Sequence, residues 1–118
     1  MPVRAKTKTQ MTSFAQSYDT TIQKLDDSLS LLIDLGAAFD LETNGDVLSV
    51  IFEDGSKFII SPNSPVNQLW VSANYEGHRF NLDPSSGVWV DEKSKEDFSS
   101  YIRRILSSKL GKVVDLSI

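Results

Sequence analysis

The chain has 118 residues, 40% of them hydrophobic, and a net charge of −4, so it is long enough to form one domain with its own core. It contains no cysteine, which excludes disulfides, thiolate metal sites and cysteine nucleophiles. No apolar run approaches the roughly 20 residues of a membrane span, and we expect neither a membrane anchor nor a secretory signal.

The charge is unevenly distributed along the chain. Residues 1–18 carry three basic side chains and no acid, whereas residues 19–46 carry seven acids against one lysine. Such an acidic block argues against a nucleic-acid partner and for cations or a basic protein surface. A solvated helix face is the simpler alternative.

The N-terminal third is predicted to be a tail followed by a helix. Residues 1–12 are rich in Thr and Lys without an apolar period, so we expect them to be disordered and residues 13–118 to form a single domain. Apolar residues recur at helical spacing over residues 13–35, with Ser13 as the expected N-cap and Gly36 at the C-terminal end.

The pattern then changes to a period of two, which is typical of strands. The predicted strands are 39–43, 47–52, 57–61, 68–73, 78–82 and 87–90. Tight turns are indicated at 44–46 and 53–56, Pro62 and Pro65 bracket a loop, and another loop surrounds Gly77.

A second helix is predicted over residues 95–109, with Ser94 as N-cap and Asp97 completing a capping box. The apolar segment 113–118 is expected to fold back on the core. All strand connections are short, which favours a mostly antiparallel sheet, and two amphipathic helices can cover only one of its faces. We therefore predict an α+β sandwich of five or six strands with both helices on one face.

Trp70 is expected to lie on the uncovered face of this sheet. Leu69 and Val71 alternate with it and claim the core face, so Gln68, Trp70 and Ser72 share the other. An exposed tryptophan is typical of a binding site, although a covering loop would give the same pattern.

Little catalytic chemistry is available to this chain. His78 is the one histidine, no nucleophile elbow or phosphate-binding loop is present, and a two-histidine metal site is impossible. What remains is carboxylate oxygen, which suits hard cations such as Mg²⁺, Ca²⁺, Mn²⁺ and iron. We call six such residues the acidic ridge: Asp19, Asp26, Asp27, Asp34, Asp40 and Glu42.

Several short stretches carry a resemblance to a known family. They are NGDVLSVIFEDGSK at 44–57, the loop proline Pro65, QLWVS at 68–72, HRFNL at 78–82, GVWV at 87–90 and VDLS at 114–117. In this order the stretches resemble the frataxin family, whose bacterial members are called CyaY, over residues 14–118.

The resemblance implies the frataxin-like fold and a role as an accessory of iron–sulfur cluster assembly. It implies weak iron binding on the acidic ridge and docking on a complex of cysteine desulfurase and scaffold protein. The docking surface maps to Gln68, Trp70 and Arg79, with Asn63 beside them. A ferroxidase and a pure interaction module remain alternatives, although the absence of Glu-x-x-His weighs against efficient ferroxidase turnover.

The chain also departs from the family pattern. Ser61, Pro62 and Asn63 stand where the family usually has Asn, a basic residue and Gln, and Gln23 and Lys24 replace common ridge acids. We therefore expect reduced iron binding. We expect a monomer, with iron-dependent oligomers as the alternative, in a bacterial cytoplasm or else in a mitochondrial matrix or mitochondrion-related organelle.

Overall fold

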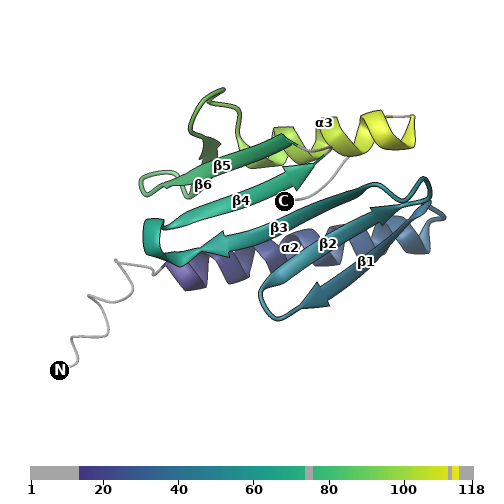
Figure 1. Ribbon diagram of the computed structural model, residues 1–118, viewed down its shortest axis with the longest axis horizontal. Coiled ribbons are helices and arrows are strands. Elements are labelled where there is room, and N and C mark those ends of the chain that lie inside the picture. The colour runs from purple at the N-terminus through teal and green to yellow at the C-terminus, as the bar shows by residue number, and fades with distance from the viewer. Residues whose placement is uncertain (1–13, 74–75, 112, 115–118) are drawn as a thin grey trace.

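The computed structural model describes residues 14–73, 76–111 and 113–114 of the chain (Figure 1). Within these residues the chain forms two α-helices, six β-strands and one 3₁₀ turn. In chain order they are α2 (Phe14–Asp34), β1 (Phe39–Asn44), β2 (Val47–Phe52), β3 (Lys57–Asn63), η1 (Ser64–Val66), β4 (Gln68–Ala73), β5 (Glu76–Asp83), β6 (Val88–Asp91) and α3 (Phe98–Leu110).

The six strands form one antiparallel meander in the order β1-β2-β3-β4-β5-β6. Short connections allow this order, because each tight turn returns the chain beside the strand it has just left. Both helices lie against the same side of the sheet, α2 near β1 and α3 near β6 (Figure 1). The predicted α+β sandwich is confirmed, and the strand number is the upper of the two expected.

The core lies between the helices and one face of the sheet. Every strand contributes the residues of one parity, such as Leu48 and Val50 in β2 or Leu69 and Val71 in β4, and all four are buried. Helix α2 adds Tyr18, Leu25 and Leu29, and α3 adds Phe98, Tyr101, Ile102 and Leu106. Of the segment 113–118, which is expected to fold back on the core, Val114 is buried in this core but Val113 is 93% exposed, and residues 115–118 lie outside the described part of the chain.

Helix α3 begins three residues later than its sequence pattern predicts. Its N-cap is Asp97, whose carboxylate accepts the backbone N–H of Ser100 at 3.0 Å, so the predicted cap at Ser94 is wrong. Lys95 has a left-handed φ of 68°, which no helical residue adopts. The buried Asp91 carboxylate accepts the N–H groups of Lys93 and Ser94, and this holds the segment before α3 as a turn.

Two predicted loops are shorter than expected, because strands extend into them. Pro62 lies within β3, opposite Leu69 of β4. The pairing of β2 with β3 ends at Ile60, so at Pro62 the strand has lost its neighbour on that side and tolerates a residue without an N–H. Gly77 lies within β5, opposite Ser72.

The predicted disordered segment 1–12 and the predicted cap Ser13 lie outside the described residues. The proposed domain boundary near residue 13 therefore stays a prediction. Neither helix of the described chain is long and apolar enough to cross a membrane.

Candidate functional site

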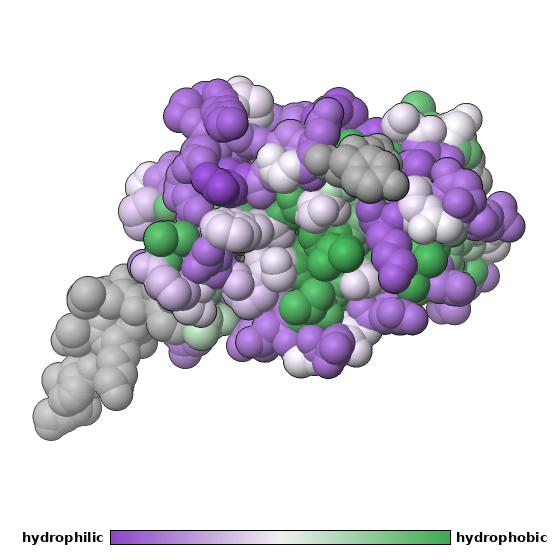
Figure 2. Space-filling view, viewed as in Figure 1, coloured by the Kyte–Doolittle hydropathy of each residue, from purple (hydrophilic) through white to green (hydrophobic). Residues whose placement is uncertain are grey.

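The sheet has one face that no described helix covers, and the candidate docking residues lie on it. Figure 2 views the molecule from this side and shows a hydrophobic patch over β2 and β3 framed by hydrophilic atoms. Val47, Ile51 and Ile59 are the half-buried apolar side chains that these strands place on the open face. An open sheet face of mixed polarity is typical of a protein-binding surface.

Trp70 lies on this face near the centre of the sheet, between Ser61 of β3 and Arg79 of β5. Its ring is half-buried, and the guanidinium carbon of Arg79 lies 5.0 Å from the ring centroid. The Arg79 side chain remains 56% exposed, so the cation–π pair is open to solvent on its outer side. Trp70 thus presents a partly exposed aromatic ring with the Arg79 guanidinium over it.

A hydrogen-bond network fixes the surroundings of Trp70. The indole Nε1–H donates to Gln68 Oε1 at 2.9 Å. The Gln68 Nε2 group donates to Asn81 Oδ1 at 3.2 Å and to Glu92 Oε1 at 3.1 Å. Asn63 lies directly opposite Gln68 in the neighbouring strand, so the four predicted docking residues are gathered on one area of the sheet.

A hollow of about 670 Å³ adjoins the Trp70 ring. Trp70 and Arg79 form one side of it, and the segment after β6, including Lys93, forms another. Glu76 and His78 also line it, so the hollow combines an aromatic face with charges of both signs. The sequence pattern did not indicate that residues 91–94 border this surface, because the contact depends on how β6 is registered against β5.

His78 is a structural residue of the helix-covered side. Its Nδ1 lies 2.9 Å from the Asp91 carboxylate and its ring centroid lies 4.8 Å from that of Tyr101. Burial alone would raise the pKa of Asp91, but the N–H groups of Lys93 and Ser94, together with His78, outweigh it and lower that pKa. The pair therefore anchors the turn after β6 to the core.

The acidic ridge divides into two groups. Asp19, Asp26, Asp27 and Asp34 all project from α2, and all but the half-buried Asp26 are exposed. Asp40 and Glu42 are exposed on the edge strand β1, where they pair with Ile51 and Ser49 and so belong to the open face. The ridge consequently wraps around the edge of the sheet.

The ridge carboxylates do not converge on a preformed ion site. Asp26 accepts a hydrogen bond from Ser30 Oγ at 3.2 Å, and Asp27 accepts one from Gln23 Nε2 at 3.0 Å. Across the part of the chain that the structure describes, no three His, Asp or Glu side chains are grouped to hold a metal ion. Such a ridge suits exposed, exchangeable cations.

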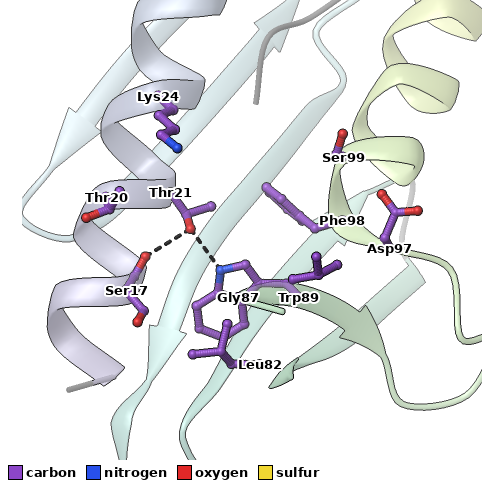
Figure 3. A pocket seen from close by; sticks show the side chains of 11 residues that line it. Ser17, Thr20, Thr21, Lys24, Leu82, Gly87, Trp89, Asp97, Phe98 and Ser99 are labelled. Carbon is purple, nitrogen blue, oxygen red and sulfur yellow. Dashed lines mark hydrogen bonds between the residues drawn. The ribbon is translucent and has the colours of Figure 1, made fainter. Parts of the chain in front are cut away.

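The second tryptophan belongs to the core. Trp89 is only 4% exposed, and its Nε1–H donates to Thr21 Oγ1 at 2.8 Å, while the Thr21 hydroxyl donates to the Ser17 carbonyl (Figure 3). It lies at the base of a groove of about 490 Å³ between α2, β6 and α3. Trp70 and Trp89 therefore differ in environment although both lie in strands.

Comparisons with known proteins agree with this architecture. A family model of the frataxin-like domain matches residues 7–112. The iron-sulfur cluster assembly protein CyaY of Pseudomonas paraeruginosa is 35% identical over 102 residues, covering 86% of this chain and 92% of that protein. CyaY of Pseudomonas fluorescens is 37% identical over 102 residues, covering 86% and 90%.

Solved structures match as well. Frataxin from Psychromonas ingrahamii superposes with a TM-score of 0.78 at 27% identity, covering 89% of this chain and 95% of that one. A trimeric frataxin from the yeast Saccharomyces cerevisiae, complexed with ferrous iron, gives a TM-score of 0.72 at 20% identity, covering 81% and 87%. The family match spans most of the sequence and both helices and the sheet agree with the solved folds, so this chain belongs to the frataxin-like family.

Proposed function

We propose that this protein is an accessory of iron–sulfur cluster assembly that docks on a complex of cysteine desulfurase and scaffold protein. The observation that carries the proposal is the Trp70 ring, half-buried beneath Arg79 on a sheet face that no described helix covers. Tryptophan, tyrosine and arginine are enriched among the few residues that supply most of the binding energy in protein interfaces. The names of the CyaY relatives support assembly of iron–sulfur clusters as the process.

The docking residues are Gln68, Trp70 and Arg79, with Asn63 beside them. Gln68 and Arg79 flank the ring through a hydrogen bond and a cation–π contact, which limits the entropy lost when a partner covers it. The nearby hollow admits a side chain of the partner.

Iron binding is assigned to the acidic ridge. Its six residues offer only carboxylate oxygens, which suit Fe²⁺ and Fe³⁺ as hard cations, and their exposure makes the binding weak and sensitive to salt. The yeast relative with ferrous iron supports iron as the ion. Dispersed carboxylates supply binding more readily than oxidation, so the proposal is an iron-binding accessory and not a ferroxidase.

A pull-down with purified cysteine desulfurase and scaffold protein tests the docking. We expect retention of the wild-type protein and clear loss of the Trp70→Ala variant. Val88→Ala is the matched control, because Val88 is an exposed apolar residue of β6 away from Trp70. Equal retention of all three proteins would contradict the proposal, and repeating the assay with Fe²⁺ shows whether the ridge contributes.

A further inference from the structure

Glu92 reaches the docking surface because of its place directly after β6. Asp91 faces the core, so the next residue faces the open side of the sheet. The Glu92 backbone N–H donates to the Arg79 carbonyl at 2.9 Å, which extends the pairing of β6 with β5 by one residue. The turn that follows is fixed by the Asp91 carboxylate through the N–H groups of Lys93 and Ser94.

The Glu92 carboxylate contacts both side chains that flank Trp70. Its Oε1 accepts a hydrogen bond from Gln68 Nε2 at 3.1 Å, and its Oε2 lies 3.7 Å from Arg79 Nη1. The first contact is a charge-assisted hydrogen bond, whereas the second is a longer, solvent-exposed ion pair that contributes little. Glu92 therefore acts chiefly on the Gln68 amide.

The Gln68 amide can have only one orientation within this network. Its NH₂ group faces two acceptors, Glu92 Oε1 and Asn81 Oδ1, and its oxygen faces the indole N–H of Trp70. Exchanging the two amide atoms would set donor against donor at Trp70 and acceptor against acceptor at Glu92. The glutamate and the indole therefore require the same orientation of the Gln68 amide, and the bond to Glu92 holds the amide in place.

We infer that Glu92 is a positioning residue of the docking surface, which holds the Trp70 ring in one orientation through the Gln68 amide. The inference rests on the proposed docking function. It specifies the partner chemistry further: the indole N–H is already satisfied within the chain, so the partner covers the ring with apolar groups and offers acceptors to the exposed side of Arg79. A partner that had to accept from the indole would first have to break the contact with Gln68.

The first test is spectroscopic and needs no partner. In ¹H–¹⁵N spectra of the full chain, Glu92→Ala should shift and broaden the indole N–H resonance of Trp70, while that of Trp89, bonded to Thr21, stays in place as the internal reference. Glu92→Gln should leave the Trp70 resonance close to wild type, because the glutamine oxygen can still accept from Gln68. Glu53→Ala, at an exposed turn, is the control for the loss of one charge.

The second test measures binding to the desulfurase–scaffold complex by the same variants, with melting curves to confirm folding. We expect Glu92→Ala to weaken binding about tenfold, as loss of one charged hydrogen bond would, and Glu92→Gln and Glu53→Ala to stay within about threefold of wild type. An unmoved Trp70 resonance in Glu92→Ala overturns the positioning role. Equal losses for Glu92→Ala and Glu92→Gln also overturn it, because they would assign the effect to the charge facing Arg79.

The two proposals can fail separately. If Glu92→Ala moves the indole resonance but Trp70→Ala binds the complex as wild type does, the docking function is wrong and the positioning of the ring stands. If Trp70→Ala loses binding and Glu92→Ala does not, the docking function stands. Glu92 then contributes nothing to docking, and the inference that it positions the docking surface is refuted.

Discussion

Replacing each tryptophan by alanine should have opposite consequences for stability and for binding. Trp89 is 4% exposed, stacks edge-on with Phe14 at 5.8 Å and donates to Thr21. Truncating such a buried aromatic costs about 3–5 kcal/mol, a large part of the roughly 5–15 kcal/mol that stabilises a small domain. Trp89→Ala should therefore unfold at much lower denaturant or not fold at all.

Trp70→Ala removes contacts that are each small. The exposed cation–π pair with Arg79 contributes about 0.5–1 kcal/mol and the indole hydrogen bond to Gln68 about 0.5–1.5 kcal/mol. Because the ring is half-buried and the surface can take up water after truncation, we expect a loss of about 1–2 kcal/mol in unfolding free energy. Binding to the desulfurase–scaffold complex should fall by about 2 kcal/mol or more, the range of an interface hot spot.

Urea unfolding should be followed by far-UV circular dichroism. Tryptophan fluorescence would not compare the two variants on one scale, because each substitution removes one of the two tryptophans. The free energies of unfolding should separate by about 1–4 kcal/mol, with Trp89→Ala the less stable. If Trp70→Ala is destabilised as strongly as Trp89→Ala, Trp70 is a core residue. An intact fold with unchanged binding would refute its role as an anchor.

Three further predictions concern charge. Fe²⁺ titration followed by NMR should broaden the amides of residues 19–42 first, because the acidic ridge lies there; broadening centred on His78 would contradict this. The double substitution of Asp26 and Asp27 by Asn should raise Tm slightly at low salt, because it relieves a charge repulsion of at most a few tenths of a kcal/mol. A lower Tm would mean that the hydrogen bonds these carboxylates accept from Ser30 and Gln23 stabilise the fold by more than the repulsion costs. The pKa of Asp91 is lowered in the folded protein, so its stabilising effect is present above its unfolded pKa of about 4 and is lost as the pH falls through the lower folded pKa. Asp91→Asn should therefore flatten the acid limb of the curve of unfolding free energy against pH. Parallel curves for the wild type and the variant would exclude this role.

The sheet could be predicted from sequence because its information is local. Alternating apolar residues define each strand, and glycine turns such as Gly45, at φ 61°, define where the chain reverses. The start of α3 could not be found this way, since Ser94 and Asp97 both look like caps. What decides between them is the turn before α3: the buried Asp91 carboxylate accepts the N–H groups of Lys93 and Ser94, and Lys95 has a left-handed φ of 68° that a helix beginning at residue 95 could not include.

The candidate site shows the same division between local and distant information. Alternation alone places Trp70 and Gln68 on the open face, because Leu69 between them is buried. Glu92 lies 24 residues from Gln68 and enters only through the register of β5 with β6, which no local pattern specifies. The dipeptide Asp91-Glu92 then serves both sides of the sheet: the first carboxylate fixes the turn from within the core, and the second accepts a hydrogen bond from the Gln68 amide that also bonds the Trp70 indole.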